Sequence, residues 1–530
     1  MTASLEIEPG RAAGAVSRRL ARWGSERFAH RLWAKDPTLW FADPRPEIVD
    51  RLGWLELPDP AKVAAIEAFA ATIVAGEIDH VVLLGMGGSS LAPQVYGAVF
   101  GERPGHPHLV VLDSTHPDAV AAVDERVDPG RALFIVASKS GTTLETMSFF
   151  RFFWARVAER TDDPGSRFVA ITDPGTPLDS LAVERAFRAI FHAPDDVGGR
   201  YSALTDFGLV PAALTGVEIR SVLDRAAEAM DACAPGVPVD ENPALVLGAT
   251  LGELAASGTD KLVFLFDPPF GEVPDWTEQL IAESLGKDGR GIVPVPHPAR
   301  PAPWADRWVM TSSDQTIDDL PRARLTLEDP ADLGAAFFLL ELAVAAAGSV
   351  LGVHPFDQPD VQAAKEFART AMGSTAELDV ERMSLGDPAV ASAVAAVLGD
   401  LTPPRYLAMQ AYLAPTTVTT EQLDAIRGDI EAATTVVSTL GYGPRFLHST
   451  GQLHKGGPDT GVFLQIVDRP RRRLDVPGTD FSFQQLIAAQ AAGDQAALRQ
   501  RGRTVLMIDI GETEPSSLSR LRLTVGTAMR

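Results

Sequence analysis

Hydroxyl-bearing residues and one lysine are concentrated directly after the apolar stretch 133–137, in the run Ser138, Lys139, Ser140, Gly141, Thr142 and Thr143. A strand that ends in Ser, Thr and Gly before a helix gathers backbone N–H groups, hydroxyls and the positive end of a helix dipole around one point. A simpler alternative is that Thr142 only caps the next helix, with Glu145 completing a capping box. Because a cap needs one hydroxyl, the others favour a phosphorylated small molecule as ligand.

A second turn rich in glycine and serine, residues 85–90, follows the apolar stretch 81–84. Gly88 lets the backbone approach a ligand closely, and Ser89 adds a hydroxyl. The turn is not a dinucleotide fingerprint, because Ser90 stands where that motif needs Gly or Ala, and the chain has no Gly-Lys-Ser/Thr phosphate loop. The two hydroxyl-rich turns are one strand-helix unit apart, so a parallel sheet could bring them to one edge.

The elements that must position these turns alternate between short apolar runs and longer helical patterns. The expected strands are residues 81–84, 109–112, 133–136 and 168–172 in the first half and 261–266, 308–311, 406–413, 462–467 and 505–510 in the second. Helical patterns in the second half cover residues 276–284, 335–347 and 421–440. This alternation predicts an α/β fold with mainly parallel sheets flanked by helices, whose ligands bind at the carboxyl ends of the strands.

The chain has 530 residues, more than a single hydrophobic core usually serves, so we expect two or three domains, and the simplest account is two α/β domains of similar type. Prolines interrupt the helical pattern near residues 233–242. The predicted division is therefore an N-terminal region plus first domain at 1–235, and a second domain with a C-terminal extension at 236–530. The apolar stretch 335–351 approaches the length of a membrane span, but it contains Glu341, which favours a buried core helix.

Composition excludes several classes of partner and site. A net charge of −23 repels nucleic acid and anionic membranes, so we expect neither as a partner. The single cysteine, Cys233, permits no internal disulfide and no thiolate metal cluster, and the ten histidines show no metal-binding spacing. The N-terminal residues lack the apolar core of a secretory signal, so a cytoplasmic location is expected.

Four further motifs resemble the glucose-6-phosphate isomerase family, whose chains are built from sugar isomerase domains. They are an arginine motif at 198–202, a glutamate motif at 279–287, residues 355–359 followed by Lys365, and a histidine element at 447–452. The likeness runs from Leu84 to about Gly457. It is greatest to the isomerase half of bifunctional transaldolase/glucose-6-phosphate isomerases, although too few residues precede the first motif to form a transaldolase barrel.

The resemblance implies two sugar isomerase domains and reversible isomerisation of glucose 6-phosphate and fructose 6-phosphate through an enediol. It also implies a homodimer and a reaction without cofactor or metal. The phosphate-binding residues would be Gly88, Ser89, Ser138, Lys139, Ser140, Thr142 and Thr143. Two alternatives stay open: isomerisation of another phosphosugar, and a non-catalytic protein that senses sugar phosphates.

Aldose-ketose isomerisation needs one base that moves a proton between C2 and C1, and one cation beside the developing oxyanion. Glu283 is the candidate base, because burial near its helix end would raise its pKa. The alternative is an exposed glutamate paired with Lys287 four residues on. Arg200 is the candidate cation, with a salt bridge to Asp195 or Asp196 as its alternative role. The resemblance favours the catalytic role for both.

The resemblance also places Lys365 and His448 at the sugar ring, which they would open before proton transfer. Here the chain departs from the family pattern, because the histidine element follows Lys365 instead of preceding it. His354 and His454 are therefore rivals for the same role. In the family this histidine comes from a neighbouring subunit, and the altered order leaves open whether His448 serves its own chain or a partner.

Overall fold

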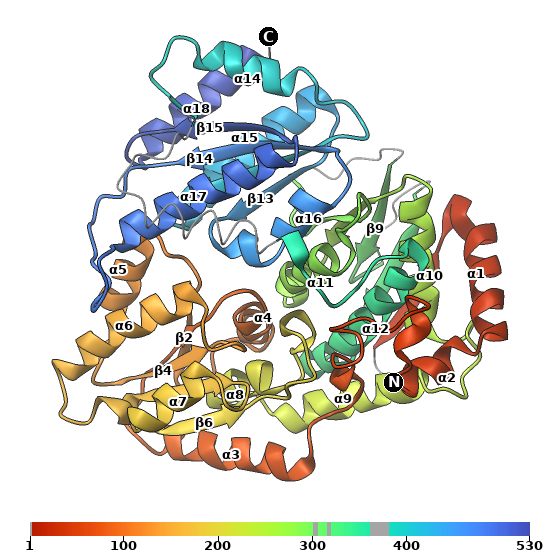
Figure 1. Cartoon of the computed structure of the whole chain (residues 1–530), viewed down its shortest axis with the longest axis horizontal. Coiled ribbons are helices and arrows are strands. Elements are labelled where there is room, and N and C mark those ends of the chain that lie inside the picture. The colour runs from red at the N-terminus through yellow and green to blue at the C-terminus, as the bar shows by residue number, and fades with distance from the viewer. Residues whose placement is uncertain (1–2, 300–305, 315–319, 361–380, 530) are drawn as a thin grey trace.

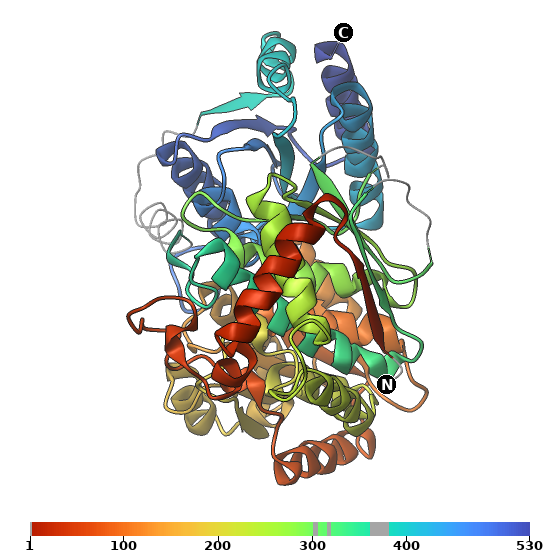
Figure 2. The same ribbon diagram turned by 90° about the vertical axis from the view of Figure 1, so that its right-hand side faces the viewer.

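The computed structural model describes residues 3–299, 306–314, 320–360 and 381–529. Its strands form three five-stranded sheets, each carrying its own helices. Figure 1 shows the three units: the first in orange and yellow, the second in green with the red N-terminal helices beside it, and the third in blue. Figure 2, turned by 90°, shows the third unit standing above the other two.

The first sheet is parallel throughout, in the order β3-β2-β4-β5-β6. Its strands are β2 (His80–Leu84), β3 (His108–Leu112), β4 (Ala132–Ala137), β5 (Phe168–Thr172) and β6 (Ala189–His192). Val81 and Leu83 pack in a hydrophobic cluster with helices on one face, whereas Val82 and Leu84 pack in a second cluster on the other. Both faces are covered, which explains why these strands are apolar at nearly every position.

The helices of the first unit also divide between the two faces of its sheet. The first face carries α3 (Pro60–Val74), α4 (Leu91–Phe100) and α8 (Asp206–Leu214). The second face carries α5 (Pro117–Arg126), α6 (Leu144–Ala158) and α7 (Pro177–Glu184).

The second sheet has the order β1-β10-β9-β7-β8. Its strands are β1 (Ser4–Glu8), β7 (Lys261–Leu265), β8 (Val293–Val295), β9 (Arg307–Thr311) and β10 (Arg322–Thr326). The N-terminal strand β1 pairs antiparallel with β10, and the other pairs are parallel. The helices of this unit are α1 (Ala13–Ser25), α2 (Phe28–Trp33), α9 (Ile219–Ala232), α10 (Pro243–Ala256), α11 (Val273–Leu285) and α12 (Leu333–Leu351).

The third sheet is parallel throughout, in the order β11-β15-β14-β12-β13. Its strands are β11 (Arg382–Ser384), β12 (Tyr406–Tyr412), β13 (Ser438–Tyr442), β14 (Gly461–Val467) and β15 (Thr504–Asp509). Its helices are α14 (Val390–Leu398), α15 (Thr417–Thr434), α16 (Gly451–Gly456), α17 (Phe483–Gln500) and α18 (Pro515–Ala528).

The α/β fold with mainly parallel sheets flanked by helices is confirmed, but the arrangement within residues 236–530 differs from the predicted single domain with an extension. The strands expected there as one series are divided between the second and third sheets. The third sheet packs against α14, α15 and α18 in a hydrophobic cluster of its own, so it forms a separate layered core. The N-terminal strand β1 also belongs to the second sheet and not to the first unit.

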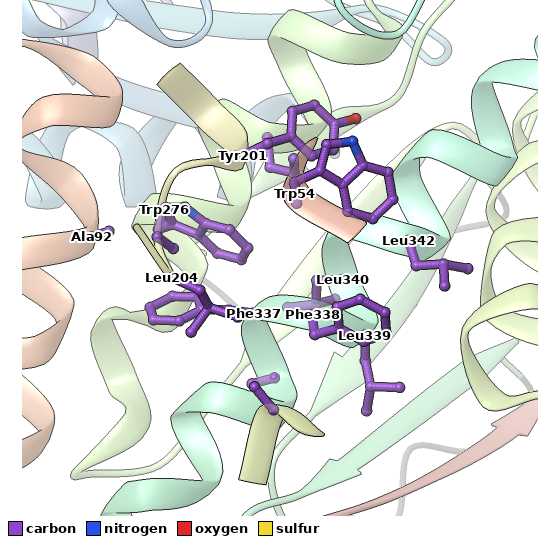
Figure 3. Close-up of a cluster of buried hydrophobic side chains, with 14 of the residues drawn as sticks. Trp54, Ala92, Tyr201, Leu204, Trp276, Phe337, Phe338, Leu339, Leu340 and Leu342 are labelled. Carbon is purple, nitrogen blue, oxygen red and sulfur yellow. The ribbon is translucent and has the colours of Figure 1, made fainter. Parts of the chain in front are cut away.

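The apolar stretch expected to be a core helix is α12, which is buried along nearly its whole length. Among the described helices, the segment Pro330–Leu351 alone is long and apolar enough to cross a membrane, and 89% of its apolar window is buried inside the protein. Figure 3 shows Phe337 and Phe338 of this helix among the rings of Trp276, Trp54 and Tyr201. The centroid distance from Phe337 to Trp276 is 4.6 Å, as expected for a tightly packed aromatic core.

The third unit packs against both of the others. Leu453 and Phe463 of the third unit share a hydrophobic cluster with Val293 and Ala282 of the second. Phe483 of α17 stacks on Phe149 of α6, with ring centroids 6.0 Å apart. The three units therefore meet around a common junction.

Candidate active site

A cavity of about 360 Å³ lies at this junction. Its walls include the turns that follow β2 and β4, the 3-10 helix Gly199–Tyr201 and one face of α11. The turn after α12 adds Phe356 and Gln358, and the 3-10 helix Arg445–His448 of the third unit adds His448. All three units thus contribute to one cavity, at the carboxyl ends of the first sheet's strands, where ligands of such sheets bind.

The cavity wall includes five of the predicted phosphate-binding residues, Gly88, Ser89, Lys139, Ser140 and Thr143. The two others support them: Ser138 Oγ lies 2.9 Å from Thr143 Oγ1, and Thr142 Oγ1 lies 3.0 Å from Ser140 Oγ. The capping-box alternative is wrong, because the helix cap is Thr143 and its side chain makes no capping hydrogen bond. The hydroxyls therefore stand at the N-terminus of α6, where an anion is stabilised.

Lys139 is held in the cavity wall by a carboxylate and a backbone oxygen. Its Nζ donates to Asp173 Oδ2 at 2.6 Å and to the Asp195 carbonyl at 3.1 Å. Burial raises the pKa of Asp173, and the nearby Lys139 and Arg51 oppose that shift. The ammonium of Lys139 therefore lies in the cavity wall beside the hydroxyls of the turn after β4, a combination that suits an anion.

Glu283 of α11 and Arg200 also line the cavity, and they form a buried ion pair. Each is 4% exposed, and Arg200 Nη1 donates to Glu283 Oε2 at 3.2 Å. Both simpler alternatives are wrong: Glu283 is not an exposed helix-end residue, and Arg200 pairs with Glu283 instead of with Asp195 or Asp196. A carboxylate and a permanent cation therefore face one cavity, as enediol chemistry requires.

Three further contacts fix the plane of the Arg200 guanidinium. Its Nε donates to Ser284 Oγ at 2.9 Å, and its Nη2 donates to the carbonyls of Pro355 at 2.7 Å and Asp357 at 3.0 Å. Lys287 supports the same turn, since its Nζ donates to the Asp357 carbonyl at 2.6 Å and lies 2.8 Å from the Asp357 carboxylate. Burial lowers the pKa of Lys287 to about 7, and the positive charge of Arg200 adds to that shift.

His448 reaches the cavity from the third unit and is oriented by the first. Its Nε2 lies 3.1 Å from Glu145 Oε1 on α6, and Gln490 Nε2 of α17 donates to the same oxygen at 2.8 Å. Gln279 links the histidine to the ion pair, because its Nε2 donates to the His448 carbonyl at 2.8 Å and to Glu283 Oε2 at 3.3 Å.

Gly87 permits this close meeting of units. Its φ is +55°, and a Cβ at this position would lie 2.8 Å from the His448 carbonyl oxygen and 2.9 Å from Gln279 Nε2. Gly88 is equally constrained, since a Cβ there would lie 2.1 Å from the Gly199 carbonyl oxygen. Any side chain at either position would separate the elements that form the cavity.

The two rival histidines lie elsewhere. His354 is 2.8 Å from the Pro46 carbonyl through Nε2, and His454 is buried with its Nδ1 3.1 Å from Gln410 Nε2. Among the described residues, His448 is therefore the histidine that lines the cavity, and it does so in the same chain as Glu283. Lys365 falls outside the described residues.

The structure adds cavity residues that the sequence did not single out: Glu47, Arg51, Asp173, Gln279 and Gln358. Glu145 was assigned only a capping role. Asp173 could have been found, because it follows directly on a parallel strand of the sheet that carries the hydroxyl-rich turns. Gln279 lies in the glutamate motif, where the sequence points to Glu283, and Gln358 lies in the 355–359 motif, where it points to Lys365. Glu47 and Arg51 carry no recognisable pattern.

A buried ion pair anchors α16, the helix that directly follows the His448 turn. Lys455 is 3% exposed and bonds Asp494, which is fully buried and also accepts a hydrogen bond from Gln465 at 2.9 Å. Replacing Lys455 with Met leaves a carboxylate buried without its cation, so we expect the free energy of unfolding to fall by about 3–5 kcal/mol.

Urea denaturation measures this loss. The matched control is Arg522→Met, which breaks an exposed pair with Asp429 and is expected to cost about 1 kcal/mol or less. Equal stability of Lys455→Met and wild type would contradict the anchoring role.

Comparison with known proteins gives matches in sequence. Residues 63–292 match the phosphoglucose isomerase family. The glucose-6-phosphate isomerase of Symbiobacterium thermophilum is 29% identical over 391 residues, which cover 61% of this chain and 86% of the relative. The glucose-6-phosphate isomerase of Staphylococcus aureus strain NCTC 8325 is 28% identical over 406 residues, which cover 63% of this chain and 89% of the relative.

Solved structures agree in fold. A glucose-6-phosphate isomerase from Chlamydia trachomatis superposes with a TM-score of 0.57 at 18% identity, over 70% of this chain and 88% of that one. A hypothetical protein from Thermus thermophilus gives a TM-score of 0.59 at 22% identity, over 70% of this chain and all of that one. The family match contains Arg200 and Glu283 but ends before His448.

Proposed function

Because the chain belongs to the phosphoglucose isomerase family, we propose that it catalyses the reversible interconversion of glucose 6-phosphate and fructose 6-phosphate. The observation that carries the proposal is that one cavity is lined both by a buried carboxylate-guanidinium pair and by hydroxyls with a lysine. A phosphosugar fits this arrangement with its inert phosphate at the hydroxyls and its reacting carbons at the ion pair.

In this proposal, Ser89, Ser140 and Thr143 donate hydroxyl hydrogen bonds to the phosphate, while Lys139 and the N-terminus of α6 supply positive charge. These residues contribute by positioning the substrate. Binding energy released at the phosphate holds C1 and C2 of the sugar against Glu283, so that proton transfer becomes an intramolecular step.

Glu283 would act as the base that removes the proton from C2 and returns it to C1. During this transfer negative charge develops on the sugar oxygens of the enediolate, and Arg200 would stabilise it. Arginine does not give up its proton in proteins, so stabilisation is the role available to it. The contacts of Arg200 with Ser284 and the 355–357 turn fix the cation before the charge appears.

His448 would move a proton at the ring oxygen or the adjoining hydroxyl, which opens the cyclic substrate. Glu145 accepts a hydrogen bond from the imidazole and would orient it, as a carboxylate does for other catalytic histidines. Lys365 remains the proposed second group for ring opening. The cytoplasmic location, the homodimer and the likeness to bifunctional transaldolase isomerases also remain predictions.

The test is a coupled assay on the purified protein. Fructose 6-phosphate is supplied, and the glucose 6-phosphate formed is oxidised by a dehydrogenase whose reduced nicotinamide is followed by absorbance. We expect turnover that fructose without phosphate does not give. Mannose 6-phosphate and glucosamine 6-phosphate are tested as competitors and as substrates. Tight binding of fructose 6-phosphate without turnover would contradict the proposal and favour a sensor.

A further inference from the structure

Two charged side chains of the cavity wall, Glu47 and Arg51, come from residues 46–55, a segment of the N-terminal region without an assigned role. We propose that Arg51 is a substrate-binding residue that holds the phosphate group together with Lys139. This inference rests on the proposed function and adds a residue to the same site.

The segment is fixed on the side away from the cavity. Ile48, Leu52 and Leu55 are each at most 2% exposed and belong to the main hydrophobic cluster. Trp54 packs on Tyr201, with ring centroids 5.2 Å apart, as Figure 3 shows. Glu47 directly precedes buried Ile48, and Arg51 directly precedes buried Leu52, so the apolar side chains anchor the segment while the two charged ones line the cavity.

Gly53 ties the segment to the loop that precedes Arg200. Its N–H donates to the Asp196 carbonyl at 3.0 Å, and a Cβ at this position would lie 2.1 Å from the Asp196 side chain. At the other end, the Pro46 carbonyl lies 2.8 Å from His354 Nε2. Glu47 has a φ of +62°, which is unusual for a residue other than glycine and occurs most often where function requires it.

The guanidinium of Arg51 meets the ammonium of Lys139 at one backbone oxygen. Arg51 Nη1 and Lys139 Nζ both donate to the Asp195 carbonyl, each at 3.1 Å. Arg51 also lies close enough to Asp173, the partner of Lys139, to oppose the upward shift that burial gives the pKa of Asp173. Each cation also has a carboxylate partner, Asp173 for Lys139 and Asp50 for Arg51, so a phosphate would bind through the N–H donors that these pairs leave over.

The guanidinium of Arg51 also carries hydrogen-bond donors beyond those used in its observed contacts. Its contacts with the carbonyls of Asp50 and Asp195 and with the Asp50 carboxylate all use Nη1. A guanidinium carries five N–H donors, so those on Nη2 and Nε are not used by these contacts. Their planar arrangement matches two phosphate oxygens, which a lysine cannot match in the same way.

The experiment compares Arg51→Gln, Arg51→Lys and wild type. In Arg51→Gln we expect the KM for fructose 6-phosphate and the Kd for inorganic phosphate, measured by titration calorimetry, to rise by about tenfold or more. We expect kcat to change by less than about threefold, because the ion pair of Glu283 and Arg200 is untouched. Arg51→Lys keeps the charge and should recover part of the affinity.

The control is Arg45→Gln, which removes an exposed arginine of the same region that stacks on Phe41. It should bind phosphate as wild type does. Folded Arg51→Gln protein with an unchanged phosphate Kd would overturn the inference. Calorimetry measures phosphate binding without turnover. If the wild-type protein binds phosphate through Arg51 but does not isomerise fructose 6-phosphate, the proposed function is contradicted and the inference about Arg51 stands.

Discussion

Replacing Glu283 by Gln is expected to lower kcat by about 10³-fold or more, with little change in the affinity for fructose 6-phosphate. The amide keeps the shape of the carboxyl group but cannot accept the C2 proton, and general base catalysis typically contributes about 10²–10⁴-fold. The oxygen of the amide can still accept the hydrogen bond from Arg200, so the buried pair is not left with an unpartnered cation. The coupled assay measures kcat, and calorimetry measures binding.

Glu278→Gln is the matched control on the same helix. Burial raises the pKa of Glu278 to about 8, so this side chain is largely neutral near pH 7 and its replacement by an amide changes little. It does not line the cavity. We expect Glu278→Gln to retain wild-type kcat. A Glu283→Gln enzyme with wild-type kcat would show that another group is the base.

Replacing His448 by Ala is expected to lower kcat/KM on the cyclic substrate by about 10²-fold, because ring opening loses its proton donor while Glu283 and Arg200 remain in place. Glu145→Gln should have a smaller effect in the same direction, since it disturbs the orientation of the imidazole and leaves the ring present. His454→Gln is the comparison variant, because His454 is buried away from the cavity beside Gln410. Its kcat/KM should stay near the wild-type value.

His448 also tests whether the site is complete within one chain. The structure places His448 and Glu283 around one cavity of a single chain, linked through Gln279. We therefore expect a refolded mixture of His448→Ala and Glu283→Gln subunits to be no more active than the two variants apart. Recovery of activity in the mixture would show that the histidine serves a neighbouring subunit.

Four of the five strands of the first sheet could be predicted from the sequence, because each is a short apolar run between polar turns, whereas the edge strand β6 was missed. β4 illustrates this, since all its residues are buried and helices cover both faces. The pairing of β1 with β10 could not be predicted, because Leu5 and its partner Leu325 are joined only by the tertiary fold. Such contacts have no local signal.

The predicted helix at 421–440 shows a second limit. α15 ends at Thr434, with Thr435 in the left-handed region as its C-cap, and β13 occupies Ser438–Tyr442. Glycine is the usual residue at such a helix end, so threonine there gave no stop signal. The β-branched residues that follow were a strand signal that the helical pattern concealed.

For the site, motifs located Glu283, Arg200 and His448 because their neighbours in the chain carry the resemblance. The residues that orient them come from elsewhere, such as Glu145 of α6 beside His448, and Gln490 of α17, which donates to Glu145. These contacts depend on how three units pack together. Sequence spacing within one unit does not encode them.

Proton transfer by Glu283 is tested most directly by deuterium exchange. Fructose 6-phosphate is incubated with the protein in deuterated water, and NMR measures how much deuterium enters at C2 of the glucose 6-phosphate formed. The same measurement is made with the Glu283→Gln variant. Wild type is predicted to introduce deuterium at C2, because the base exchanges its proton with solvent before returning it, and Glu283→Gln is predicted to introduce almost none. Exchange at the wild-type rate in Glu283→Gln would contradict the assignment of Glu283 as the base.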